Sequence, residues 1–125
     1  MNRTYQAIIV LGLVGAIGFL SSCEKEYYVP DPGSDPSVPV SFSTDMQPFF
    51  DAKCVSCHNG GGVPLDLSPA TSYDNIISGG YVNTAVPENS SLYTKIDVGG
   101  SMESYATPAE RTMTLNWITQ GALDN

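Results

Sequence analysis

A run of five residues, Cys54-Val55-Ser56-Cys57-His58, constrains the fold of this chain more than any other feature. Two thiols separated by two residues lie within about one helical turn, where they can add to the two vinyl groups of a haem. The next residue, His58, then projects its imidazole at the iron. The spacing therefore predicts one covalent haem c, with its iron, attached through Cys54 and Cys57.

The two cysteines also allow three other interpretations. A zinc site needs four ligands, whereas the domain offers Cys54, Cys57 and a single histidine that adjoins Cys57. A thioredoxin-like redox pair starts a helix within a βαβ unit, but these cysteines follow a helical segment and precede three glycines. The third interpretation is a plain disulfide with an incidental histidine. Haem attachment is favoured because it explains both the cysteine spacing and the position of the histidine.

The N-terminal residues have the pattern of a secretory signal peptide. Arg3 precedes an apolar, glycine-containing stretch at residues 7–20, which ends in Leu20-Ser21-Ser22-Cys23. A helix of that length spans roughly 21 Å, which is less than the roughly 30 Å hydrocarbon layer of a membrane. We therefore expect residues 1–22 to be a cleaved signal peptide rather than a permanent transmembrane helix.

The sequence around Cys23 resembles the lipobox of bacterial lipoproteins. That resemblance implies that Cys23 becomes the first residue of the mature chain and carries a diacylglycerol and an N-acyl chain, which together anchor a protein stably. The charged run Glu24-Lys25-Glu26 is similar to lipoprotein sorting signals. We expect a bacterial cell-envelope protein, anchored by lipid in the outer membrane, at the periplasmic face or the cell surface. The alternative is a soluble secreted protein with a free Cys23 thiol.

A tether separates this anchor from the folded domain. Residues 24–40 contain four prolines and many polar residues, without the apolar period of a helix or a strand. Fully extended, such a segment reaches roughly 50 Å at about 3.1 Å per residue. We therefore assign residues 23–43 to a lipidated tether and residues 44–125 to one domain.

The charge of the chain excludes one class of partner. Five Lys and Arg residues stand against thirteen Asp and Glu residues, which gives a net charge of −8. Such a chain lacks the cationic surface that phosphate neutralisation requires, so we expect no nucleic-acid partner.

Four segments have helix signals, and no segment shows the alternation of a strand. The first opens on a capping-box pattern, Thr44-Asp45-Met46-Gln47, and runs towards Cys54. The second has Ser68 as N-cap and Pro69 at its first position, and it ends at Gly79-Gly80. Its predicted apolar face consists of Tyr73, Ile76 and Ile77.

The third and fourth helices are predicted at residues 88–96 and 107–120. Leu92 and Ile96 lie four residues apart in the third helix. The fourth begins with a capping box from Thr107 to Glu110 that also places Pro108 at the first helical position. Residues 60–62 and 81–87 read as loops, so the sequence predicts a small all-α domain of about four short helices with long loops around one haem. Such a small core needs an additional stabilising cross-link, which a covalent haem provides.

The domain resembles class I c-type cytochromes, in particular the short planctomycete-type cytochrome c domains of secreted proteins and lipoproteins. The resemblance covers residues 47–122, nearly the whole domain. It implies a class I cytochrome c fold, with His58 as the fifth iron ligand and a methionine from the loop before the last helix as the sixth. The matching segments are Pro48-Phe49-Phe50 to Cys54, the attachment motif, Leu65-Asp66-Leu67-Ser68 with Tyr73, Gly79-Gly80, residues 86–93 and residues 117–122.

By this resemblance the sixth ligand is Met102, which lies just before the Thr107 cap. Met46 and Met113 fall on helices, where they are expected to pack in the core. The Pro64 carbonyl is the candidate acceptor for the second ring nitrogen of His58. Relatives commonly have prolines after this methionine, whereas Glu103 follows Met102 here. The apolar walls of the haem site are expected from Phe49, Phe50, Leu65, Leu67, Leu92, Tyr93 and Trp117.

The sequence thus predicts a membrane-tethered monohaem c-type cytochrome that transfers single electrons in the periplasm or at the cell surface. We expect a carrier rather than an enzyme, because no paired carboxylates or activated nucleophile accompany the motif. Its partners are then a redox donor and a redox acceptor, bound transiently by a monomer. One alternative is a haem-based module that binds or senses a small ligand through a weak or open sixth iron position. Another is a haem-free lipoprotein with a structural or adhesive role.

Overall fold

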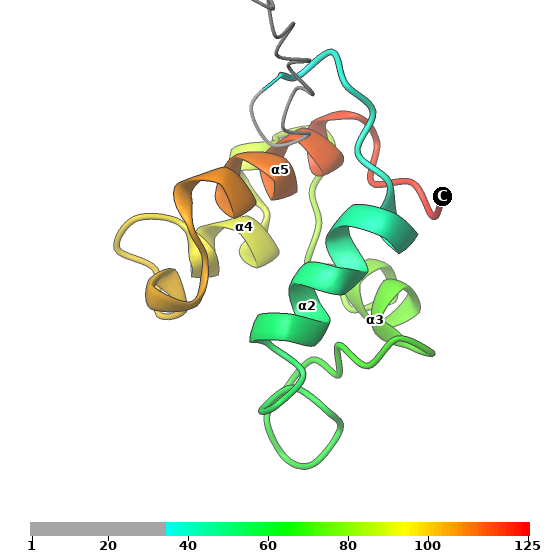
Figure 1. The fold of residues 1–125 in the computed structure, drawn as a ribbon, viewed down its shortest axis with the longest axis vertical. Coiled ribbons are helices and arrows are strands. Elements are labelled where there is room, and N and C mark those ends of the chain that lie inside the picture. Colours follow the sequence, from blue (N-terminus) through cyan, green and yellow to red (C-terminus); the bar gives the residue numbers. More distant parts are fainter. Residues whose placement is uncertain (1–34) are drawn as a thin grey trace, which may run out of the picture.

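The computed structural model describes residues 35–125, which form an all-α domain (Figure 1). The predicted signal peptide, Cys23 and the tether up to residue 34 lie outside the described residues. Within residues 35–125 there is no strand, as predicted, and no helix has the length and apolar character needed to cross a membrane. The helices are α2 (Gln47–Lys53), α3 (Ser72–Ser78), α4 (Ser91–Ile96) and α5 (Pro108–Thr119), with a π-helical turn at Phe42–Met46 and 3₁₀ turns at Pro87–Asn89 and Glu103–Tyr105.

Helix α5 begins with the predicted capping box. The Thr107 side chain accepts a hydrogen bond from the Glu110 backbone N–H at 3.3 Å, and the Glu110 carboxylate accepts one from the Thr107 N–H at 2.7 Å. Pro108 occupies the first position, where its missing N–H costs nothing. Because every partner lies within four residues, this helix start is encoded locally.

Helix α2 is entered differently from the prediction. The helical run that leads into α2 is capped by Ser41 rather than by Thr44, and the Ser41 side chain accepts a hydrogen bond from the Thr44 N–H. The reciprocal bond runs from the Ser41 N–H to the Asp45 carboxylate at 2.8 Å. The first turn is a π-helical turn, so the two capping residues lie four apart instead of three. This turn places both Phe42 and Met46 in the core.

Helix α3 is shorter than predicted. Ser68 begins a turn, in which its carbonyl accepts from the Ser72 N–H at 2.9 Å, and the helix itself starts at Ser72. The chain leaves α3 at the predicted glycines, with Gly80 in the left-handed conformation at a φ of 71°. Ile76 is fully buried, but Ile77 is 41% exposed, so its predicted place on the buried face was wrong.

The segment predicted as one helix at residues 88–96 consists of a 3₁₀ turn followed by α4. Ser90 separates them with an extended backbone. Its buried hydroxyl accepts a hydrogen bond from the Asn83 N–H at 2.9 Å, so the preceding loop is fastened at the break. Leu92 and Ile96 both face the core as predicted.

The packed domain begins before residue 44. Val40 and Phe42, which the sequence places in the tether, are 2% and 4% exposed. The Phe42 ring lies edge-on to Tyr73, with centroids 5.1 Å apart, and 5.4 Å from Trp117. These contacts make residues 40–43 part of the domain. Val40 and Phe42 follow closely spaced prolines, and the segment shows no apolar periodicity from which this packing can be predicted.

The N-terminal segment is fastened to the C-terminus, which lies beside the start of the helical run that leads into α2 (Figure 1). Gln120 accepts from the Val40 N–H at 2.8 Å and donates to the Val38 carbonyl at 2.9 Å. The Asn125 side chain accepts from the Phe42 N–H at 2.9 Å. These hydrogen bonds between the N-terminal segment and the C-terminus therefore fix where the chain enters the domain.

Candidate functional site

A cavity of about 480 Å³ opens between α2, α4 and the loops that follow them. This volume lies in the range of about 300–1,000 Å³ that small-molecule and cofactor sites occupy. Most lining side chains are apolar, and the charged ones are two lysines, Lys53 and Lys95. The lining residues from α2 and α4 are Phe49, Phe50, Lys53, Ser91, Leu92, Lys95 and Ile96, and those from the rest of the chain are Cys54, Cys57, His58, Val63, Pro64, Leu65, Leu67, Tyr81, Ser101, Met102 and Tyr105.

The two cysteines lie on one extra turn at the end of α2. The Cys54 N–H donates to the Phe50 carbonyl at 2.8 Å, which continues the helical pattern. The N–H groups of Cys57 and His58 then both donate to the Cys54 carbonyl, at 3.1 and 2.9 Å. Both cysteines are free and line the cavity, with Cys54 half-buried and Cys57 exposed. The turn therefore presents two thiols and one imidazole at the same cavity edge.

The imidazole of His58 is held by backbone carbonyls. Its Nδ1 lies 2.9 Å from the Pro64 carbonyl oxygen and 3.0 Å from that of Leu65. Because carbonyls only accept hydrogen bonds, Nδ1 is the protonated nitrogen and donates. The hydrogen bond predicted to Pro64 is thus present, and it leaves Nε2 with a free lone pair on a side chain that lines the cavity.

The loop that supplies these carbonyls is closed and strained. The Leu67 N–H donates to the His58 carbonyl at 2.9 Å, so the loop returns to its own start. Leu65 adopts a φ of 69°, a left-handed conformation that costs a non-glycine residue roughly 1–2 kcal/mol. Strain of this kind persists where surrounding contacts impose it, and it is concentrated at functional sites. Here it accompanies the convergence of two successive carbonyls on one nitrogen.

The surroundings of Cys54 disfavour its thiolate. Burial raises the pKa of the Cys54 thiol to about 11, and the negative charge of Glu110 adds to the rise against the opposing effect of Lys53. A nucleophilic or redox-active cysteine needs a lowered pKa instead. The environment of Cys54 therefore disfavours the interpretation of the two cysteines as a thioredoxin-like redox pair.

Met102 differs from the other two methionines of the described residues, Met46 and Met113, in its place relative to the cavity. Met102 lines the cavity, and its backbone N–H donates to the Lys95 carbonyl at the end of α4, at 2.7 Å. Met46 is fully buried in the core, and Met113 packs against the core from α5; neither lines the cavity. The structure thus brings Met102 to the same cavity as His58 across a long stretch of sequence.

Most of the predicted apolar walls are found at the cavity, with two exceptions. Trp117 lies in the aromatic core, where its indole N–H donates to the Leu123 carbonyl at 3.0 Å, and Tyr93 also lies away from the cavity. Sequence reasoning missed several lining residues, which are Lys53, Val63, Tyr81, Ser91, Lys95, Ile96, Ser101 and Tyr105. Lys53 precedes Cys54, and Tyr105 lies three residues after Met102. Their closeness in sequence to two predicted site residues could have identified them as lining residues.

Comparison with known proteins adds no relative. No protein-family model, curated protein or solved structure matches the chain. Among residues 35–125, no group of three or more His, Cys, Asp or Glu side chains is arranged to hold a metal ion. The cavity and the residues around it are therefore the features of the described residues that bear on function.

Proposed function

We propose that the domain is a monohaem c-type cytochrome of the class I fold, tethered to a bacterial membrane through Cys23, that transfers single electrons. One observation carries this proposal. The four side chains and the carbonyl predicted from sequence to hold a haem, those of Cys54, Cys57, His58, Met102 and Pro64, all belong to residues that line one apolar cavity. The order along the chain also supports the fold: the motif follows the first helix, and Met102 precedes the last.

The donor set suits a haem in three respects. A haem iron takes only axial ligands from the protein, and an imidazole nitrogen with a thioether is one of the known pairs. Two thiols on one turn match two vinyl groups. Two lysines are the charged lining residues of the cavity, and they suit a ligand that carries carboxylates.

When bound, the haem supplies a one-electron couple of ferric and ferrous iron. The chain's own residues then have three tasks. Cys54 and Cys57 would hold the haem through thioethers, each formed by addition of an S–H group across a vinyl double bond with no net oxidation. The carbonyls of Pro64 and Leu65 orient the His58 ring and raise its basicity as a ligand. Met102 would supply a thioether ligand to the iron, and together with apolar walls that exclude water it would raise the reduction potential.

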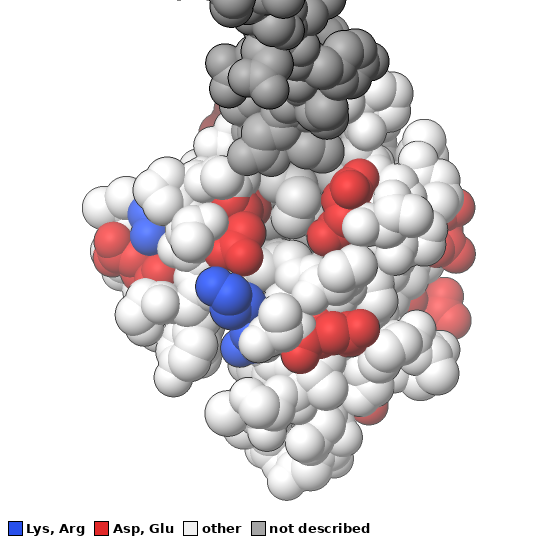
Figure 2. Space-filling view, in the orientation of Figure 1, with Lys and Arg blue, Asp and Glu red and all other residues white. Residues whose placement is uncertain are grey.

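The surface supports a role as a diffusing or tethered carrier. Figure 2 shows carboxylates spread over one face of the domain, with few basic side chains among them. The acidic residues of the chain, whose net charge is −8, steer the protein towards a basic redox partner and keep it soluble. Electron-transfer encounters are small and transient, so we propose a monomer that meets its donor and acceptor in turn.

The test is visible spectroscopy of protein made in cells with a c-type haem maturation system. The ferric protein is expected to show the weak far-red band of an iron to methionine-sulfur bond. Met102→Ala removes that band, whereas Met113→Ala, which changes a methionine away from the cavity, leaves it. Haem without the band in the unmodified protein contradicts Met102 ligation and favours the small-ligand module. Protein without covalent haem contradicts the proposal as a whole.

A further inference from the structure

The segment that contains Met102 has little helical structure of its own. It runs from the end of α4 to the start of α5 and contains a single 3₁₀ turn at Glu103–Tyr105. Its internal hydrogen bonds are short-range, such as that from the Glu103 N–H to the Gly100 carbonyl at 3.2 Å. Segments with few long-range contacts open readily, so the position of Met102 depends on what fastens this segment to the helices.

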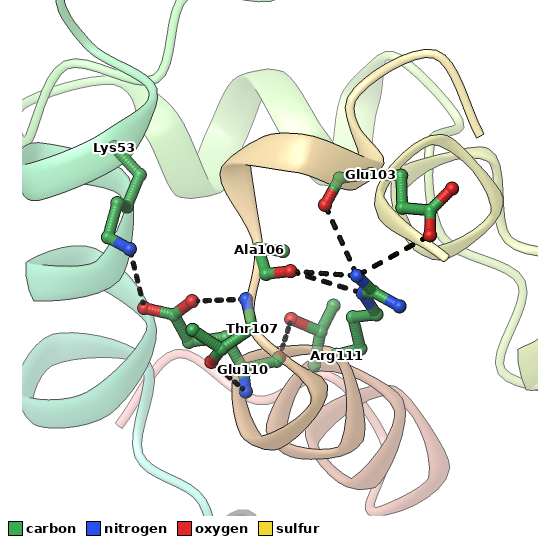
Figure 3. A network of polar contacts seen from close by, with 7 residues as sticks. Lys53, Glu103, Ala106, Thr107, Glu110 and Arg111 are labelled. Carbon is green, nitrogen blue, oxygen red and sulfur yellow. Dashed lines mark hydrogen bonds and ion pairs between the residues drawn. The ribbon is translucent and has the colours of Figure 1, made fainter. Parts of the chain in front are cut away.

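Arg111 fastens the segment to α5. Its guanidinium donates to the Ala106 carbonyl from both Nε and Nη2, at 3.2 and 3.0 Å, and to the Glu103 carbonyl at 3.3 Å. Nη2 also lies 3.8 Å from the Glu103 carboxylate. Figure 3 shows the guanidinium directed at both residues. A planar fork of donors can satisfy several acceptors at once, which a lysine cannot do.

Glu103 extends this contact to the far side of Met102. Its second carboxylate oxygen accepts a hydrogen bond from the Gly99 N–H at 2.8 Å. The Glu103 side chain therefore links Gly99, before Met102, to Arg111, after it. Gly100 fits closely here, because an added Cβ would lie 2.4 Å from the Lys95 carbonyl oxygen.

The location of Arg111 is unfavourable for the helix itself. It ends the first turn of α5, where the helix dipole disfavours a positive charge. Its side chain is only 16% exposed, so its hydrogen bonds are less screened than those of a surface cation. A residue that violates a local preference of its helix while satisfying carbonyls outside that helix is best explained by what it positions.

The preceding residue makes a second link from the same turn. The Glu110 carboxylate lies 3.6 Å from the ammonium of Lys53, the residue before Cys54 (Figure 3). One turn of α5 thus contacts both the helix that leads into the cysteines and the segment that contains Met102. The Lys53 side chain is 40% exposed, and an exposed pair of this kind contributes little. Arg111 is the stronger of the two links.

We infer that Arg111 is a positioning residue that holds the Met102 segment at the cavity and so keeps the Met102 thioether in place as the sixth iron ligand. This inference rests on the proposed function. It concerns a residue that does not line the cavity and acts through Glu103 and Ala106.

The test compares three variants as ferric holoproteins. Arg111→Gln removes the charge and the fork, Arg111→Lys restores the charge alone, and Thr112→Ala changes an exposed neighbour on α5. In Arg111→Gln we expect loss of the far-red band and imidazole binding that is at least about tenfold tighter, because a displaced methionine no longer competes for the iron. Arg111→Lys recovers part of the band, and Thr112→Ala keeps all of it. A full band and unchanged imidazole affinity in Arg111→Gln overturn the inference.

A second measurement separates failure of the inference from failure of the proposed function. If the unmodified chain takes up no haem, the proposed function fails, and amide hydrogen exchange tests Arg111 alone. Exchange at Met102 and Ala106 is expected to be at least about tenfold faster in Arg111→Gln than in Thr112→Ala. Equal exchange rates overturn the positioning role whether or not haem is present.

Discussion

Cys54 and Cys57 lie one turn apart, yet their surroundings give the two thiols different reactivity. Cys57 is exposed, whereas Cys54 is half-buried with a pKa raised to about 11. In the haem-free protein we expect a small alkylating reagent at pH 8 to modify Cys57 at least about tenfold faster than Cys54, because only the thiolate attacks. Peptide mass mapping of partly modified protein measures both rates, and Cys57→Ser and Cys54→Ser isolate each site.

The pH dependence gives a further check on Cys54. Its modification rate should keep rising with pH up to about 11. The folded state favours the protonated Cys54 thiol over the thiolate. The protonated thiol therefore makes its full contribution to the free energy of unfolding below the ordinary pKa of 9.0, and this contribution is lost as the pH rises through the folded-state pKa of about 11. Equal rates for the two cysteines at pH 8, or a plateau for Cys54 near pH 9, contradict this picture.

At the scale of single residues, the sequence predicts those site residues that are recognised by their spacing along the chain. The cysteine spacing and the adjacent His58 form a recognisable pattern because, under the proposed function, three groups reach one ligand from one turn. The left-handed backbone of Leu65 is not readable, because leucine has no preference for that conformation and only the closed loop imposes it. The apolar walls of the cavity were predicted only in part, because an apolar residue of the core and one that lines the cavity look alike in the sequence.

At the scale of single elements, the start of α5 allows a clean prediction. Thr107→Ala removes the hydroxyl that accepts from the Glu110 N–H and leaves that donor unpaired. The loss of such an N-cap costs about 1 kcal/mol of unfolding free energy. Urea denaturation followed by circular dichroism measures the cost, with Thr112→Ala as the control within the same helix. A change below about 0.3 kcal/mol indicates that the cap does not stabilise the helix.

Helix boundaries were predictable where their determinants are local. The α5 cap and the glycines after α3 depend on neighbours in sequence, and both were predicted. The start of α2 was not, because a π-helical turn lengthens the spacing between Ser41 and Asp45 beyond the usual capping box. The break before α4 depends on a hydrogen bond from the Asn83 N–H to Ser90, which no local pattern signals.

At the scale of the whole domain, the N-terminal segment belongs to the core. Phe42 is 4% exposed and contacts three aromatic rings, those of Phe50, Tyr73 and Trp117. We expect Phe42→Ala to lower the unfolding free energy by about 3 kcal/mol or more, as removal of a buried phenylalanine does. Ser37→Ala, an exposed change in the same segment, should cost less than about 0.5 kcal/mol.

Chemical denaturation of the two variants, prepared in the same haem state, measures this difference. A loss below about 1 kcal/mol for Phe42→Ala means that residues 40–43 behave as the tether that composition alone suggested. The sequence places the start of the domain at residue 44, after these residues, because the nearby prolines and the lack of apolar periodicity indicate a tether. Long-range hydrogen bonds to Gln120 and Asn125 order this segment. Fold class, by contrast, follows from the absence of strand alternation.

Intact mass spectrometry shows whether this cavity holds one covalent haem. The mature domain, made in cells with a c-type haem maturation system, is compared with its Cys54→Ser/Cys57→Ser variant. We expect a mass increase of one haem that survives denaturation, with both thiols consumed, and no increase in the variant. A domain that emerges at its polypeptide mass, with Cys54 and Cys57 free or joined as a disulfide, contradicts this expectation.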